Sequence, residues 1–142
     1  MINGYIDEVN KVRGTSSSHI DSAGTYTLDG TQAVAYSRIR YTAGGDYKRA
    51  ERQRTVLFKV FESAKQMNTA AKIKMVSDLI GHVNTNYNTD EILSVFKNLA
   101  DYTVEDSTAY PQVFYGGKVD GAWVEVPTTL ADMATGVHQF LE

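Results

Sequence analysis

The sequence predicts a helix-rich α/β fold for this 142-residue chain, on three observations. Apolar residues recur at intervals of three and four in several segments, which is the spacing of amphipathic helices. Near the C-terminus, two short segments rich in aromatic and β-branched residues flank glycine-containing turns, which is typical of a strand hairpin. The length suits a single domain with its own buried core.

The first predicted helix begins near the N-terminus and ends near Gly14. Its apolar side chains are spaced four and three residues apart: Ile2, Ile6 and Val9. The next segment, Thr15 to Thr27, is rich in serine, threonine and glycine, so we expect a surface loop. His19 and Asp21 lie in this loop without a third candidate ligand nearby, so the sequence does not indicate a metal site there.

A second helix is predicted to begin at Gly30. Asp29 is its expected N-cap, and Gln32, three positions later, completes a capping box. We expect this helix to give way near Ser37 to an extended segment. Because side chains alternate along a strand, Arg38 and Arg40 would then point to the same side.

A flexible turn at Thr42 to Gly45 leads into a third helix, which we expect Asp46 to cap and which runs to about Gln66. Its expected apolar stripe is Tyr47, Ala50, Leu57, Phe61 and Ala64, widened by Phe58 and Val60. On another side, polar residues cluster in the first two turns: Asp46, Arg49, Arg52 and Gln53. The positive end of the helix dipole favours an anion at this position.

The remaining elements are two helices, a hairpin and a final helix. Asn68 or Thr69 caps a helix to about His82, with Ala71, Ile73, Val76, Leu79 and Ile80 expected to face the core, and another helix starts at Thr89-Asp90-Glu91. A strand is predicted over Ser107 to Tyr115 and its partner over Ala122 to Val126, with turn signals at Gly116-Gly117 and Asp120-Gly121. Pro127 is expected in the first turn of a helix that runs from Thr128 to Leu141.

The segment Tyr36–Arg54 concentrates the positive charge of the chain. It holds five of the six arginines: Arg38, Arg40, Arg49, Arg52 and Arg54. Its net charge is +4, whereas the whole chain carries −3. Guanidinium groups form a rigid planar fork that suits phosphate oxygens, so the segment indicates a phosphate or pyrophosphate site. The alternative is a solvated helix face held by ion pairs between neighbouring turns.

Two runs of residues carry a resemblance to a known family. They are LDGTQAVAYSRIR, from Leu28 to Arg40, and DYKRAERQR, from Asp46 to Arg54. Together they resemble the signature of the LytR-CpsA-Psr family, an L-D/N-G-x-Q-A-x-x-Y-x-R-x-R run followed by D-x-x-R-x-x-R-Q. The resemblance covers nearly the whole chain, and we expect residues 1–142 to be the C-terminal portion of a single family domain. It implies an α/β fold in which a mixed sheet is flanked by helices.

The resemblance implies an enzyme of the bacterial cell envelope. Members of the family are membrane-anchored on the extracytoplasmic face of the cell membrane, mostly in Gram-positive bacteria. They are held to transfer a glycopolymer, such as teichoic acid or capsular polysaccharide, from a polyprenyl-pyrophosphate carrier to peptidoglycan. The reaction is a phosphotransfer that leaves a phosphodiester link.

The same resemblance assigns roles to residues of this chain. The pyrophosphate-binding residues it implies are Arg38, Arg40, Arg49, Arg52 and Gln53. Asp46 matches the acidic residue of the motif, which we expect to orient an arginine. As catalytic residues we expect Arg38, Arg40 and Asp46, because phosphoryl transfer depends on positioning and on neutralising charge over the phosphate oxygens.

The resemblance also implies parts that this chain does not contain. The Mg²⁺-binding aspartates of the family lie upstream of the matched segment, as do the rest of the domain and the membrane anchor, so no metal ligands are expected here. We therefore expect the isolated chain to be inactive in transfer, although it belongs to an active parent. We also expect exposed apolar surface and self-association as a homo-oligomer.

Two other functions use the same basic residues. A non-catalytic module that binds polyanionic cell-wall polymers would need the arginines but no metal. A nucleic-acid-binding protein would place Arg49, Arg52 and Arg54 against phosphates, and the family is also described as cell envelope-related transcriptional attenuators. The acidic net charge of the chain and its single basic segment argue against nucleic acid.

Overall fold

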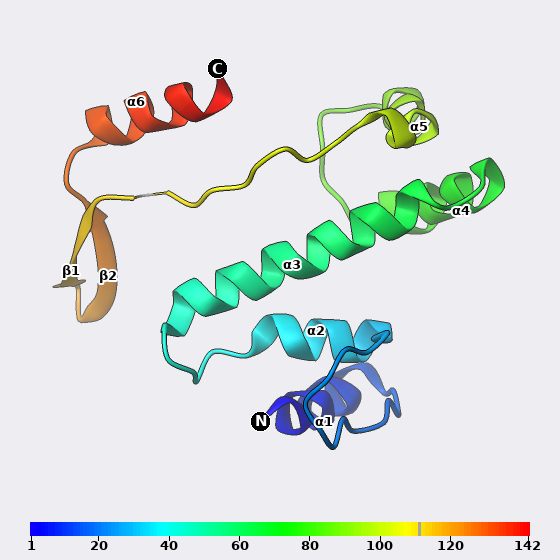
Figure 1. The fold of residues 1–142 in the computed structure, drawn as a ribbon, viewed down its shortest axis with the longest axis horizontal. Coiled ribbons are helices and arrows are strands. Elements are labelled where there is room, and N and C mark those ends of the chain that lie inside the picture. Colours follow the sequence, from blue (N-terminus) through cyan, green and yellow to red (C-terminus); the bar gives the residue numbers. More distant parts are fainter. Residues whose placement is uncertain (111) are drawn as a thin grey trace. The chain divides into compact units, whose positions relative to one another are not determined.

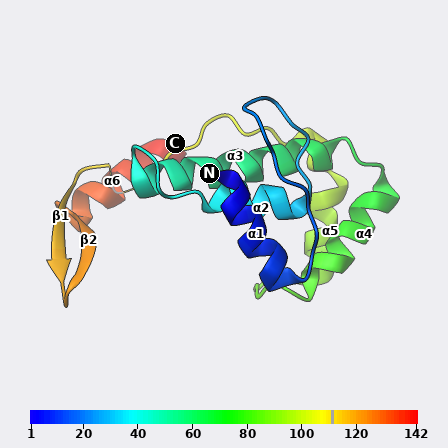
Figure 2. The same ribbon diagram turned by 90° about the horizontal axis from the view of Figure 1, so that it is seen from below.

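The computed structural model describes residues 1–110 and 112–142, which form two units. The first unit spans Met1–Tyr102 and the second Thr103–Glu142. The first contains α1 (Ile2–Arg13), α2 (Gly30–Arg38), α3 (Gly45–Lys65), α4 (Thr69–Ile80), α5 (Thr89–Lys97) and the 3-10 helix η1 (Leu99–Asp101). Within it, α1 packs against α2 and α2 against α3, while α4 packs against α5 (Figures 1 and 2).

The contact between α1 and α2 forms a small buried core. Ile6 and Val9 of α1 lie against Ala35 of α2, and all three are buried. The predicted helix is confirmed, since α1 ends where Gly14 adopts a positive φ of 66°. This core holds α1 against α2.

The segment between α1 and α2 contains neither helix nor strand, as predicted. Side-chain hydrogen bonds hold it against the two helices. Asn10 of α1 donates its amide to the Ser17 carbonyl (3.0 Å) and accepts the Ser17 backbone N–H (2.9 Å). Gln32 of α2 donates to the Ser18 carbonyl (3.0 Å). The loop is therefore tied to α1 and α2 at its first half.

The predicted capping box at the start of α2 is confirmed. The Asp29 carboxylate accepts the Gln32 backbone N–H (2.9 Å), and the Gln32 side chain accepts the Asp29 N–H (3.0 Å). The predicted end of this helix is wrong, because α2 continues through Arg38 and no strand follows. The helix ends at Ile39, whose side chain is buried and whose backbone leaves the helical region.

The start of α3 also differs from the prediction. Gly44 is the N-cap, with φ at 91°, and α3 begins at Gly45, so Asp46 is not the cap. Asp46 lies in the first turn of α3, where its carboxylate contacts arginines instead of backbone N–H groups. Two consecutive glycines with positive φ allow the chain to turn before the acidic residue is reached.

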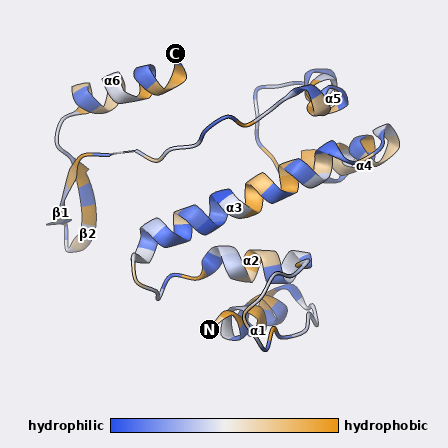
Figure 3. Ribbon diagram, viewed as in Figure 1, coloured by the Kyte–Doolittle hydropathy of each residue, from blue (hydrophilic) through white to orange (hydrophobic). Residues whose placement is uncertain are grey.

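The predicted apolar stripe of α3 is mostly not buried. Hydrophobic residues gather in the second half of this helix (Figure 3), where Ala64 is buried but Leu57 is 69% exposed. Phe58 and Val60 are exposed as well. The periodicity of the sequence therefore identifies an apolar face of α3 that the neighbouring elements of the first unit leave largely uncovered.

The next two helices begin behind asparagine caps. Asn68 accepts the Ala71 N–H (2.9 Å) at the start of α4, and Asn88 forms a capping box with Glu91 at the start of α5. Helix α4 ends at Ile80, two residues before the predicted His82. Of the predicted core positions of α4, Val76 is buried, whereas Ile73 and Leu79 are exposed.

The second unit contains an antiparallel hairpin of β1 (Phe114–Val119) and β2 (Ala122–Pro127). Asp120 and Gly121 form its turn, both with positive φ, as a two-residue hairpin turn requires. The strand predicted over Ser107 to Tyr115 is wrong in its bounds, and its Pro111 lies outside the described residues. Gly116 and Gly117 lie within β1, because the tighter Asp-Gly turn sets the register.

A final helix, α6 (Leu130–Leu141), follows β2. Its N-cap is Thr129, whose hydroxyl accepts the Asp132 N–H (3.0 Å). Pro127 ends β2 and is not in the first turn of the helix, contrary to prediction. Helices together with a small sheet confirm the predicted helix-rich α/β class. None of the described helices is both long enough and apolar enough to cross a membrane.

Candidate anion-binding site

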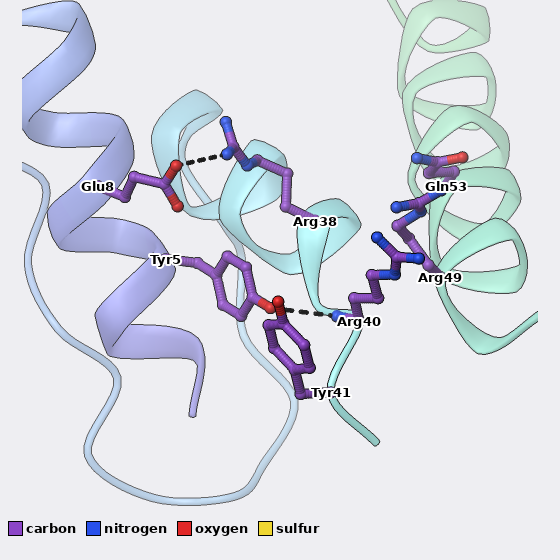
Figure 4. Close-up of a pocket in the computed structure, with 7 residues that line it drawn as sticks. All are labelled: Tyr5, Glu8, Arg38, Arg40, Tyr41, Arg49 and Gln53. Carbon is purple, nitrogen blue, oxygen red and sulfur yellow. Dashed lines mark hydrogen bonds and ion pairs between the residues drawn. The ribbon is translucent and has the colours of Figure 1, made fainter. Parts of the chain in front are cut away.

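A polar cavity of about 460 Å³ lies within the first unit. Its lining residues come from α1, the end of α2, the following turn and the start of α3: Tyr5, Glu8, Arg38, Arg40, Tyr41, Arg49 and Gln53 (Figure 4). Four of the five predicted pyrophosphate-binding residues are in this set. The structure therefore brings Arg38, Arg40, Arg49 and Gln53 around one space.

The backbone that carries Arg38 and Arg40 differs from the expected strand, but both side chains still line the cavity. Arg38 is the last residue of α2, and Arg40 lies in the turn beyond it. Between them, the side chain of Ile39 is buried, which anchors this turn. The Tyr5 hydroxyl accepts the Arg40 backbone N–H (3.3 Å), which links the turn to α1 (Figure 4).

Asp46 connects two of the cavity arginines. Its carboxylate lies 2.9 Å from the Arg40 guanidinium and 3.0 Å from that of Arg49. Like charges placed side by side repel, and a shared carboxylate offsets that repulsion. Each guanidinium has five N–H donors, so donors remain on both for a ligand.

Arg38 has a different partner. Its guanidinium lies 2.6 Å from the Glu8 carboxylate, which comes from α1. Figure 4 shows this pair on one side of the cavity, with Arg40, Arg49 and Gln53 grouped on the other. Three guanidinium groups thus face two carboxylates, which leaves the site net positive.

Arg52 lies apart from the cavity lining, although the motif places it with the other arginines. It donates to the Ile39 carbonyl (3.1 Å) and to the Thr42 hydroxyl (3.2 Å). Both acceptors belong to the segment that carries Arg40. Arg52 therefore holds this segment against α3 and is half-buried.

A second ion pair on α3 lies next to the arginine cluster. Lys48 contacts Glu51 at 2.6 Å, and this hydrogen bond lowers the pKa of Glu51 below its ordinary value, with smaller contributions from Arg54 and Arg52. Glu51 is thus an anion at neutral pH but does not line the cavity. It reduces the positive charge of the helix outside the site itself.

Tyr5, Glu8 and Tyr41 are lining residues that the sequence did not indicate. Tyr5 and Glu8 are three residues apart and share a face of α1. Their contact with the arginine segment depends on how α1 packs on α2, which no local pattern specifies. Tyr41 adjoins Arg40 in sequence and is largely exposed.

The described residues contain no group of three or more His, Cys, Asp or Glu side chains that could hold a metal ion. His19 contacts Asp7 at 2.7 Å, in a pair without a third ligand. The donors in the cavity are mainly cationic, and cations do not ligate Mg²⁺. These residues do not fit a Mg²⁺ site, and we assign no chemical step to a metal.

Comparison with known proteins shows the family of this chain. The model of the LytR_cpsA_psr family matches residues 5–135. The chain belongs to this family. The match includes every residue of the cavity lining, from Tyr5 to Gln53, and confirms the resemblance carried by the two motif runs.

Two curated relatives are similar to this LytR-CpsA-Psr chain. One is the polyisoprenyl-teichoic acid–peptidoglycan teichoic acid transferase TagU of Enterococcus faecalis, 32% identical over 101 residues. The other is biofilm regulatory protein A of Streptococcus mutans, 28% identical over 109 residues. These matches cover 70% and 75% of this chain but only 32% and 27% of the relatives. The chain thus spans about a third of the length of the curated relatives it matches.

Proposed function

We propose that this chain supplies the pyrophosphate-binding arginines of a glycopolymer–peptidoglycan phosphotransferase. The convergence of Arg38, Arg40, Arg49 and Gln53 on one cavity is the observation that carries the proposal. Membership of the LytR-CpsA-Psr family and the relative named as a teichoic acid transferase support the same reaction class. The ligand is a pyrophosphate that links a polyprenyl carrier to a cell-wall glycopolymer.

The arginines act by binding and by neutralising charge. In the transfer, a hydroxyl of the peptidoglycan acceptor attacks the phosphorus next to the glycopolymer and forms a new phosphoester bond. The bond to the second phosphorus breaks, polyprenyl phosphate leaves, and the hydroxyl proton passes to solvent. Charge develops on the phosphate oxygens, where positioned guanidinium groups stabilise it. In this scheme Arg38 and Arg40 contact the pyrophosphate, and Asp46 keeps Arg40 beside Arg49.

The setting of the whole protein is part of the proposal. The parent acts at the extracytoplasmic face of the cell membrane, to which it is anchored, and any Mg²⁺ is held by residues outside this chain. The isolated chain binds pyrophosphate but does not transfer glycopolymer. Self-association of the chain stays a prediction, which light scattering tests.

The experiment that tests the proposed ligand compares three polyanions. A short-chain polyprenyl pyrophosphate, duplex DNA and a teichoic-acid oligomer are titrated into wild type and into the Arg38→Ala/Arg40→Ala double variant. We expect pyrophosphate binding to weaken about tenfold or more, because two charge-assisted hydrogen-bonding groups are lost. The control is Lys59→Ala/Lys97→Ala, which removes the same charge from exposed positions outside the cavity lining.

The outcomes distinguish the candidate functions. Pyrophosphate binding that survives the Arg38→Ala/Arg40→Ala change contradicts the site assignment. A stronger response to the teichoic-acid oligomer than to pyrophosphate favours a non-catalytic module for polyanionic wall polymers. Tight, salt-sensitive binding of DNA favours the transcriptional alternative.

A further inference from the structure

Two carboxylates contact the cavity arginines, and they do so in different ways. Asp46 belongs to α3, the same helix as Arg49, and holds Arg40 and Arg49 together. Glu8 comes from α1 and itself lines the cavity. It therefore occupies space that a ligand would enter, whereas Asp46 is not part of the lining.

Glu8 is free to leave Arg38. The pair is short, at 2.6 Å, but the Glu8 side chain is 51% exposed. Among the described residues, Arg38 is the one hydrogen-bond or ion-pair partner of Glu8. Rotation of this side chain into solvent thus breaks a single contact, and water can replace it because the side chains of Arg38 and Glu8 are 46% and 51% exposed.

The Glu8–Arg38 ion pair is weak enough for a competing anion to break it. An exposed ion pair shifts an equilibrium by about fivefold at most. A phosphate group carries at least as much charge as a carboxylate and offers more oxygens to the planar guanidinium fork. A phosphate brought to Arg38 as part of a ligand already bound elsewhere in the cavity would compete effectively, because its local concentration is high.

We propose that Glu8 is a displaceable internal anion that occupies the second phosphate position of this cavity. One phosphate binds to Arg40, Arg49 and Gln53. The second phosphate displaces the Glu8 carboxylate from Arg38 and binds there. This inference rests on the pyrophosphate function proposed above. The arrangement in Figure 4, with Glu8 and Arg38 facing the other three residues across the cavity, is the juxtaposition that carries it.

In this arrangement Glu8 affects the binding of a single phosphate differently from the binding of a pyrophosphate. A single phosphate bound by Arg40 and Arg49 leaves the Glu8–Arg38 pair intact, so Glu8 affects phosphate binding only through long-range charge. A pyrophosphate must displace Glu8 to reach Arg38. Glu8 thus lowers affinity for pyrophosphate specifically and supplies the repulsive element that keeps small anions from Arg38.

The test is calorimetric titration of inorganic phosphate and inorganic pyrophosphate into wild type, Glu8→Gln and Asp7→Asn, at neutral pH and low ionic strength. Asp7 adjoins Glu8 on α1 but contacts His19 instead of an arginine, so Asp7→Asn removes an equal charge without freeing Arg38. We expect Glu8→Gln to strengthen pyrophosphate binding by about two- to fivefold beyond the control. Phosphate binding should change by the same small factor in both variants.

The possible results separate the two proposals. Pyrophosphate binding that responds equally to Glu8→Gln and Asp7→Asn overturns the displacement model but keeps the proposed ligand. Weaker pyrophosphate binding in Glu8→Gln also overturns it, since Glu8 would then orient Arg38. If none of the three proteins binds pyrophosphate, the proposed function fails and this inference fails with it. Circular dichroism of the helices checks that both variants are folded.

Discussion

The two oxygens of the Asp46 carboxylate contact two different arginines, Oδ2 with Arg40 at 2.9 Å and Oδ1 with Arg49 at 3.0 Å. The two arginines come from different parts of the chain, one from the turn after α2 and one from α3. A single acidic residue in the first turn of α3 thus sets the spacing between two cations.

We predict that Asp46→Asn weakens pyrophosphate binding by about five- to tenfold, the loss of roughly one charge-assisted hydrogen bond. The variant makes the site more positive, but the two guanidinium groups are no longer held side by side. Calorimetric titration measures the change. The matched control is Glu51→Gln, which removes a charge from the same helix outside the cavity lining. Stronger binding in Asp46→Asn would show that net charge, and not the position of the arginines, decides affinity.

Arg52 is predicted to matter for stability more than for binding. Arg52→Met removes the donors to the Ile39 carbonyl and the Thr42 hydroxyl, so we expect a loss of about 1–3 kcal/mol in the free energy of unfolding. Urea denaturation followed by circular dichroism measures it.

The comparison for Arg52 is Arg49→Met on the same helix. Arg49 has an exposed ion pair, so this change should cost less than about 1 kcal/mol of stability but weaken pyrophosphate binding. If Arg52→Met weakens binding as much as Arg49→Met and leaves stability unchanged, Arg52 belongs to the binding set that the motif implies.

Gly44 is predicted to resist substitution. Its φ of 91° is unfavourable for an L-residue, and an added Cβ would lie 2.7 Å from Cγ of Lys48. We expect Gly44→Ala to destabilise the first unit by about 1–2 kcal/mol. Gly4→Ala is the control, because Gly4 lies in α1 with open space around its Cβ position and should gain up to about 1 kcal/mol of helix stability. Equal effects of the two changes would contradict the backbone argument.

The cap of α2 makes a pH-dependent contribution to stability. The backbone N–H of Gln32 lowers the pKa of Asp29 below its ordinary value of 3.8. A lowered pKa in the folded state means that the stabilisation is complete above 3.8 and is lost as pH falls through the lower folded value. Asp29→Asn keeps a capping oxygen but cannot titrate.

We therefore predict that wild type loses its stability advantage over Asp29→Asn as the solution is acidified past this range. Urea unfolding of both proteins at a series of pH values gives the difference in free energy directly. Taking the difference cancels other groups, including Glu51, whose pKa is also lowered. A difference that does not vary with pH rules out this role for the Asp29 carboxylate.

The local features of this fold could be predicted because they depend on neighbouring residues. The capping box of Asp29 and Gln32, the helix end at Gly14 and the Asp120-Gly121 turn are each specified within four residues. The end of α2 and the start of α3 were predicted wrongly, since burial of Ile39 and two positive-φ glycines outweighed the alternation and the acidic cap.

The composition of the site was predictable only on its basic side. The motif indicated the arginines, and three of them do line one cavity. Glu8 and Tyr5 could not be predicted as lining residues, because they precede Arg38 by about thirty residues and reach it only through the packing of Ile6 and Val9 on Ala35. The exposed apolar face around Leu57 was predicted as a face but not as exposed, because periodicity identifies an apolar face and not what covers it.

The hairpin gives this chain a built-in spectroscopic label. Trp123 is the single tryptophan of the sequence, belongs to the second unit and is 71% exposed, with its indole ring over Gly116. The described helices other than α6 lie in the first unit. Tryptophan emission therefore reports the environment of β1 and β2, whereas far-ultraviolet ellipticity mainly reports the arginine-bearing helices. The melting of one unit can thus be followed separately from that of the other without adding a dye.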